Sequence, residues 1–204
     1  MDTEVTDWLI TPAGEPRGYI EPHALNELWF HTGTACNLAC PFCLEGSSPG
    51  DNRMGRMTLA DVIPFMQEAL ELGVKQFSFT GGEPFIVKDL VNILNQASGL
   101  RPSLVITNGT EPLLKRLKQI EALRDNPHPV SFRISIDWTD RQRHDLGRGE
   151  GTFDQSLEAI ARLQQLGFGV SLARQMESDE DTAAVDAQFQ SLVLAAGYKG
   201  DIRV

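Results

Sequence analysis

The stretch Val130–Asp137, with the sequence Val-Ser-Phe-Arg-Ile-Ser-Ile-Asp, indicates the fold class because it alternates strictly between apolar and polar residues. In a strand this alternation gives two unlike faces: Val130, Phe132, Ile134 and Ile136 on one side, and Ser131, Arg133, Ser135 and Asp137 on the other. A parallel strand of a doubly wound sheet is buried on both faces and would be continuously apolar. The polar face therefore lines a wet or ligand-filled space, as in a partly open barrel, or it faces solvent because the strand lies at a sheet edge.

Further β-type runs flank this stretch, and helix-type segments separate them. These runs are Leu28–His31, Val74–Thr80, Ser103–Thr107, Phe168–Ala173 and Asp201–Val204. Alternation of strands and helices predicts a parallel sheet with helical crossovers. We therefore expect an α/β fold, a partial (β/α)6 barrel similar to a TIM barrel, that ends at its sixth strand. Residues 28–204 would form this core domain, and residues 1–27 would be a lead-in segment.

The segment after the fourth predicted strand is expected to be a loop, because it contains Gly147, Gly149 and Gly151 before the next helix. Trp138, at the start of this segment, is expected to pack against neighbours or to lie at a rim. His144 falls in the middle of the segment, so we expect its side chain to be solvated.

The charge balance excludes several classes of function. The 204 residues carry 18 basic and 28 acidic side chains, which gives a formal net charge of −10, and 41% of the residues are hydrophobic. Such an acidic chain lacks the basic footprint that binds nucleic-acid phosphates or an anionic membrane. No apolar run approaches the roughly 20 residues that span a bilayer, and the first residues lack the pattern of a signal peptide. We expect a globular protein of the cytoplasm that binds neither nucleic-acid backbone nor membrane.

All three cysteines, Cys36, Cys40 and Cys43, are close together and directly follow the first predicted strand. An odd number of cysteines packed this closely makes a poor disulfide framework and favours metal binding. Structural zinc usually takes four protein ligands, and the sequence offers no second C-x2-C pair. Three thiolates suit a cube-shaped iron–sulfur cluster that keeps one iron free of protein ligands. An open iron is a catalytic feature, because a substrate or cofactor can occupy it.

A second motif, Thr80-Gly81-Gly82-Glu83-Pro84, follows the second predicted strand. The carboxyl ends of parallel strands are where α/β folds place their sites. The two glycines let a ligand approach the backbone closely, Glu83 offers a carboxylate to an ammonium group, and Pro84 stiffens the exit. The alternative is an ordinary turn between a strand and a helix.

Together, the C-x3-C-x2-C loop and the Gly-Gly-Glu-Pro turn resemble the radical S-adenosylmethionine (radical SAM) enzyme superfamily. The resemblance covers most of the chain from about Leu28 onward. It implies that Cys36, Cys40 and Cys43 hold a [4Fe–4S] cluster, whose fourth iron is chelated by the amino and carboxylate groups of S-adenosylmethionine. It also implies an electron donor such as a flavodoxin or a ferredoxin, and cleavage of S-adenosylmethionine to a 5′-deoxyadenosyl radical that takes a hydrogen atom from a substrate.

The resemblance further implies roles for individual cofactor-binding residues. Phe42 would lie near the adenine, and the turn of Gly81, Gly82, Glu83 and Pro84 would receive the methionyl ammonium. Polar residues at or after the ends of the third and fourth strands would contact the ribose and the carboxylate: Asn108, Ser135, Asp137 and Arg148. Asn108 is equally typical of a plain turn.

The sequence does not identify the substrate, which would be a small molecule or a peptide. No cysteine beyond the three is present to bind a second cluster. The alternative function is a non-catalytic iron–sulfur or zinc-binding scaffold, or a partner module, of the same fold. Because Asp201–Val204 would be only the beginning of a sixth strand, we expect a native chain that continues beyond Val204, or else a partner or second copy that closes the open side.

Overall fold

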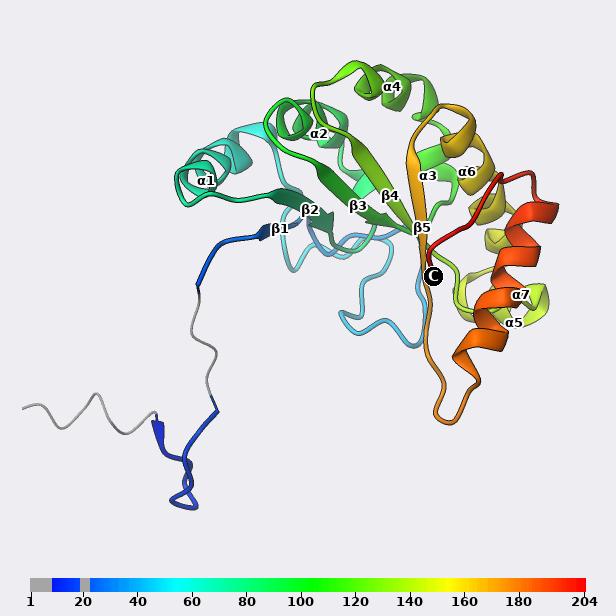
Figure 1. The fold of residues 1–204 in the computed structure, drawn as a ribbon, viewed down its shortest axis with the longest axis horizontal. Helices are drawn as coiled ribbons and strands as arrows, with labels where there is room; N and C mark the ends of the chain where they lie inside the picture. Colours follow the sequence, from blue (N-terminus) through cyan, green and yellow to red (C-terminus); the bar gives the residue numbers. More distant parts are fainter. Residues whose placement is uncertain (1–8, 19–22) are drawn as a thin grey trace, which may run out of the picture.

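The computed structural model describes residues 9–18 and 23–204, and in this part of the chain five parallel strands form one sheet (Figure 1). The strands lie in sequence order: β1 (Glu27–His31), β2 (Gln76–Thr80), β3 (Ser103–Thr107), β4 (Val130–Ser135) and β5 (Gly169–Ala173). Each strand pairs in parallel with the next. The sheet is not closed, since β1 and β5 are its two ends. The predicted α/β fold with a partial barrel is confirmed.

The helices connect the strands and, in Figure 1, gather along one side of the sheet. They are α1 (Leu59–Glu71), α2 (Leu90–Ser98), α3 (Glu111–Leu114), α4 (Leu117–Glu121), α5 (Arg141–Arg148), α6 (Thr152–Gln165) and α7 (Thr182–Ala195). The first helix begins after the N-cap Thr58, whose backbone N–H donates to the carboxylate of Asp61 at 2.8 Å. This hydrogen bond gives the N-cap backbone a partner and fixes the start of the helix.

The two faces of the sheet differ as the alternation in the fourth strand predicts. Phe77, Phe79 and Phe132 are fully buried in the core against the helices. On the opposite face, Arg133 and Ser171 pair in register and are only partly buried. Because β4 lies between β3 and β5, the alternative in which it is an edge strand with a solvated face is wrong.

The run 201–204 starts to extend the sheet beyond β5. Arg203 forms an isolated parallel bridge with Ser171, and the N–H of Leu172 donates to the carbonyl oxygen of Arg203 at 2.8 Å. Figure 1 shows this last part of the chain beside β5. The bridge places Arg203 in the sixth position of the sheet.

The segment after β4 corrects one expectation from the sequence. It contains the helix α5, which begins after Asp140, whose carboxylate accepts a hydrogen bond from the N–H of Arg143 at 2.8 Å. His144 is the one residue of this helix that is buried, and its side chain is fully inaccessible rather than solvated. A helix that buries a single histidine has no apolar periodicity, so the sequence pattern could not reveal it.

The lead-in segment 1–27 is described only in part, and its separation from the core remains a prediction. Within it, Ile10 and Pro16 form an antiparallel bridge around a turn. Among the described residues, no helix combines the length and the apolar character that crossing a bilayer requires.

Candidate functional site

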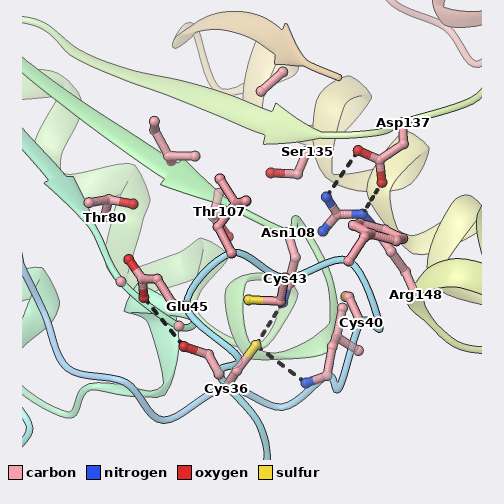
Figure 2. A pocket seen from close by; sticks show the side chains of 18 of the residues that line it. Cys36, Cys40, Cys43, Glu45, Thr80, Thr107, Asn108, Ser135, Asp137 and Arg148 are labelled. Atoms are coloured by element: carbon pink, nitrogen blue, oxygen red, sulfur yellow. Dashed lines mark hydrogen bonds and ion pairs between the residues drawn. The ribbon is translucent and has the colours of Figure 1, made fainter. Parts of the chain in front are cut away.

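A cavity of about 350 Å³ lies at the carboxyl ends of the strands (Figure 2). Its wall comes from segments that follow all five strands, from Cys36 after β1 to Gln175 after β5. Ten of the residues predicted for the site line it: Cys36, Cys40, Phe42, Cys43, Gly81, Gly82, Asn108, Ser135, Asp137 and Arg148. Glu83 and Pro84, which were also predicted, do not line it.

Backbone hydrogen bonds shape the cysteine loop. The N–H of Cys36 donates to the carbonyl oxygen of Ser48 at 3.2 Å, and the N–H of Cys43 donates to that of Cys40 at 3.1 Å. The N–H of Leu38 lies 3.4 Å from Cys36 Sγ, which accepts its hydrogen bond. All three thiols are free and partly exposed. The loop therefore presents three available sulfur ligands to one cavity.

Burial favours the protonated form of two of these thiols. It raises the pKa of Cys36 to about 11. It also raises the pKa of Cys40, where the guanidinium of Arg148 acts in the opposite direction. Because the thiolate is the metal ligand, a metal must displace these protons when it binds.

The donor set fits an iron–sulfur cluster better than a single metal ion. In the described ranges, no three His, Cys, Asp or Glu side chains lie close enough to hold one ion. A cubane cluster binds each thiolate through a different iron, so its ligands need not converge on one point. Cys36, Cys40 and Cys43 supply three such ligands and leave one iron for another molecule.

The two glycines after β2 allow the turn to pack directly against the start of the cysteine loop. A β-carbon on Gly82 would lie 2.2 Å from the carbonyl oxygen of Ala35. Gly81 has a φ of 148°, and a β-carbon there would lie 2.7 Å from Thr32 Oγ1. The N–H of Gly82 donates to the carbonyl oxygen of Gly33 at 2.9 Å. No larger residue fits at either position without moving the backbone.

Glu83 lies behind this turn, with 1% of its surface exposed. Its Oε1 accepts hydrogen bonds from the N–H of Phe85 at 2.9 Å and the hydroxyl of Thr107 at 2.8 Å. Its Oε2 accepts from the N–H of Asn108 at 2.9 Å. Burial raises the pKa of Glu83, and these three donors oppose the rise. The carboxylate thus fastens the turn after β2 to the end of β3.

Asn108 takes part in a polar network beside the cysteines. Its Nδ2 donates to Asn37 Oδ1 at 3.0 Å, and its Oδ1 accepts from the hydroxyl of Thr110 at 2.6 Å. Asn37 Nδ2 in turn donates to Thr110 Oγ1 at 3.0 Å. The network joins the end of β3 to the cysteine loop and fixes the amide of Asn108 at the cavity wall.

Asp137 and Arg148, which follow β4, form an ion pair at the cavity wall, visible in Figure 2. The guanidinium Nε of Arg148 lies 2.5 Å from Asp137 Oδ2, and its Nη2 lies 3.3 Å from Oδ1. The two side chains are 3% and 14% exposed. The sequence predicted both residues for the site but not their pairing, because the helix α5 that carries Arg148 was not predicted.

Phe42 is held by aromatic and glycine contacts from the segment after β4. Its ring packs edge-on against Trp138, with 5.6 Å between the ring centroids. A β-carbon on Gly147 would lie 2.7 Å from Phe42 Cε1, so only glycine leaves room for this arrangement. Trp138 Nε1 donates to Glu177 Oε1 at 3.1 Å, and the guanidinium of Arg143 lies 4.6 Å from the Trp138 ring. The loops after β1, β4 and β5 therefore meet around Phe42.

Arg174 lines the cavity and was not predicted from the sequence. Its side chain is 6% exposed and forms ion pairs with Glu180 at 2.6 Å and Asp186 at 3.4 Å. Its position directly after β5 was the available signal, since ends of parallel strands carry the site residues of such folds.

Comparison with known proteins shows which proteins this chain is similar to. The family model of the radical SAM superfamily matches residues 30–176. The GTP 3′,8-cyclase of Haemophilus influenzae is 29% identical over 137 residues, covering 65% of this chain and 39% of that protein. A probable GTP 3′,8-cyclase of Pyrococcus horikoshii is 32% identical over 142 residues, covering 67% of this chain and 42% of that protein. The chain thus spans about two fifths of the length of these relatives.

Solved structures show the same fold. SuiB of Streptococcus suis superposes with a TM-score of 0.68 at 17% identity, covering 86% of this chain and 38% of SuiB. A radical SAM methyltransferase of Sphaerobacter thermophilus superposes with a TM-score of 0.56 at 18% identity, covering 82% of this chain and 52% of that protein.

Proposed function

Because this chain belongs to the radical SAM superfamily, we propose that it is a radical SAM enzyme with the family's cofactors, a [4Fe–4S] cluster and S-adenosylmethionine. The observation that carries the proposal is that one cavity brings three free thiols together with a glycine turn and polar strand ends. Cys36, Cys40 and Cys43 would hold the cluster. When bound, the cluster and S-adenosylmethionine would supply reductive cleavage of the sulfonium carbon–sulfur bond and hydrogen-atom abstraction from the substrate, with the electron coming from a reduced flavodoxin or ferredoxin.

The residues around the cavity would orient the cofactor. Gly81 and Gly82 expose backbone beside the cysteine loop, which suits the methionyl ammonium and carboxylate. Asn108, fixed by its network, and Ser135 offer polar groups to the ribose. Phe42 offers an aromatic surface to the adenine, a role its edge-on contact with Trp138 would stabilise.

Glu83 was predicted to receive the methionyl ammonium. Its three hydrogen bonds and its burial favour a positioning role, in which the carboxylate fixes the turn that does so. The ion pair of Asp137 with Arg148 keeps both buried charges compensated. While it stays paired, the guanidinium of Arg148 has further N–H donors that would bind a carboxylate or ribose oxygen of the cofactor.

The same proposal includes a small-molecule or peptide substrate, an electron donor such as a flavodoxin or a ferredoxin, and a cytoplasmic location. The chemistry needs a strong one-electron reductant, and reduced thiols persist in the cytosol. The substrates named for the relatives belong to much longer proteins, so the substrate of this chain is approached below from its own residues.

The proposal is tested by anaerobic reconstitution with iron and sulfide, followed by metal analysis and electron paramagnetic resonance. We expect about four irons and four sulfides per chain, as a single cubane requires, and a spectrum of the reduced cluster that changes when S-adenosylmethionine is added. A Cys40→Ala variant should lose the cluster, whereas Glu45→Gln, a control in the same loop, should keep it. A protein that takes up only zinc, or a cluster that is indifferent to S-adenosylmethionine, would support the alternative of a non-catalytic scaffold.

A further inference from the structure

A second cavity, of about 320 Å³, lies beside β5 and carries a concentration of positive charge that the proposed cofactor site does not use. Its wall includes Arg133, Arg174, Arg203, Asp186 and Thr182. The only acidic side chain in this wall, Asp186, already pairs with Arg174, which also pairs with Glu180 outside it. The two remaining arginines are a distinct feature in a chain whose net charge is −10.

The register of the sheet puts these two arginines on one face. Arg133 of β4 is the partner of Ser171 of β5, and Ser171 is the parallel bridge partner of Arg203. Residues in register on parallel strands point to the same side, so the three side chains form a row on the polar face of the sheet. Neighbouring strands lie about 4.8 Å apart, which places the two arginine backbones roughly 10 Å apart with the serine between them.

The side chains in this row have capacity to bind a ligand. Arg133 Nε lies 3.3 Å from Ser171 Oγ, which directs the guanidinium toward the middle of the row. In the described part of the chain, neither Arg133 nor Arg203 has a carboxylate within ion-pair distance. A guanidinium carries five N–H donors, so both retain several that are not used within the protein.

We propose that Arg133 and Arg203, with the hydroxyl of Ser171 between them, bind an anionic group of the substrate, a phosphate or a carboxylate. Two guanidinium forks and a hydroxyl match the several acceptor oxygens of such a group. The inference rests on the proposed function only in calling this ligand the substrate.

The position of the row fits a substrate that reaches the cofactor site. Both cavities are lined by Ala173 and Arg174, so they adjoin at the end of β5. Arg133 precedes Ser135, a wall residue of the cofactor site, by two residues on the same face, which is roughly 7 Å along the strand. An anion bound at the row would leave the rest of the molecule directed toward the three cysteines.

Titration calorimetry of the reconstituted protein with inorganic pyrophosphate and with succinate tests the inference without a known substrate. We expect at least one of the two anions to bind, and Arg133→Gln and Arg203→Gln each to weaken binding about ten- to a hundredfold, as the loss of charge-assisted hydrogen bonds predicts. Binding of pyrophosphate alone indicates a phosphorylated substrate, and binding of succinate alone indicates a carboxylate. Arg162→Gln, at an exposed arginine on α6 that pairs with Glu158, is the matched control and should bind as the parent does.

Arg133→Lys, which keeps the charge, should retain part of the affinity, and thermal melting of each variant separates lost binding from lost folding. Equal affinity in Arg133→Gln, Arg203→Gln and the control, or no binding of either anion at millimolar concentration, would overturn the inference. S-adenosylmethionine cleavage without substrate should be unchanged in the control Arg162→Gln, whose arginine lines neither cavity. A protein that binds the anion but cleaves no S-adenosylmethionine would refute the proposed function while leaving the anion site intact.

Discussion

Replacing Glu83 by glutamine distinguishes two roles for this carboxylate: fixing the turn after β2, or binding the methionyl ammonium directly. The structure shows both oxygens accepting hydrogen bonds: Oε1 from Phe85 N–H and the Thr107 hydroxyl, and Oε2 from Asn108 N–H. The amide NH2 of glutamine would face at least one backbone N–H, leaving a buried donor without an acceptor. Such a loss costs about 1–3 kcal/mol, and weaker hydrogen bonds to the remaining neutral oxygen add to it. Relief of the buried charge offsets part of this, so we expect Glu83→Gln to lower the free energy of unfolding by about 2 kcal/mol.

The assay is anaerobic urea denaturation of the protein without cluster, combined with equilibrium binding of S-adenosylmethionine to the reconstituted protein. Glu68→Gln, a change of the same chemistry at an exposed carboxylate of α1 that does not line the cavity, is the control for both measurements. We expect the stability loss only in Glu83→Gln, whose affinity for S-adenosylmethionine should fall less than tenfold. Unchanged stability together with a ten- to hundredfold loss of affinity would show that the carboxylate binds the methionyl ammonium directly, and would refute the positioning role.

Three further changes test other parts of the site. Gly147→Ala should weaken S-adenosylmethionine binding several-fold with full cluster content, because the new β-carbon would lie 2.7 Å from Phe42 Cε1; equilibrium dialysis that finds parental affinity would contradict this. Arg148→Gln should lower the free energy of unfolding by about 3 kcal/mol by leaving the carboxylate of Asp137 buried and unpaired, and the double change with Asp137→Asn should restore most of it in denaturation experiments. Burial, aided by Arg148, lowers the pKa of His144 from 6.5 to about 4. The free energy of unfolding should therefore fall by up to about 3 kcal/mol as the pH falls from 6.5 to 4. His144→Gln should flatten this part of the pH dependence, and an unchanged pH dependence would show that another group titrates.

The sign of the histidine effect follows from proton binding. Between pH 4 and 6.5 the unfolded chain binds a proton at His144 that the folded chain does not. Stability therefore rises with pH across this window and is constant above it with respect to this group.

The strands and the outline of the site could be predicted because their signals are local. The third strand, Ser103–Thr107, has the predicted bounds, and the other four strands differ from their predicted runs by one or two residues at their ends. The sixth predicted run, Asp201–Val204, forms only an isolated bridge to β5. The three cysteines lie on one loop, which follows β1. The glycine turn follows β2, the strand that pairs with β1. Features of this kind can be recognised in the sequence because each depends on residues that are close together in the chain.

The parts that could not be predicted depend on contacts between distant segments. The sequence indicates that the carboxylate of Glu83 is free to bind a ligand, but Thr107 and Asn108, at the end of β3, donate hydrogen bonds to it. The pairing of Asp137 with Arg148 requires α5, a helix whose one buried residue is a histidine. The row of Arg133 and Arg203 exists only in the register of β4, β5 and the residue bridged to β5. None of these relations has a periodic signature in the chain.

The most direct test of the central claim is product analysis of the reconstituted protein, incubated anaerobically with S-adenosylmethionine and dithionite. We expect 5′-deoxyadenosine and methionine to form in equal amounts, and a variant with alanine at Cys36, Cys40 and Cys43 to form neither. A protein that contains the full cluster, binds S-adenosylmethionine and is reduced, yet forms no 5′-deoxyadenosine, would contradict the claim.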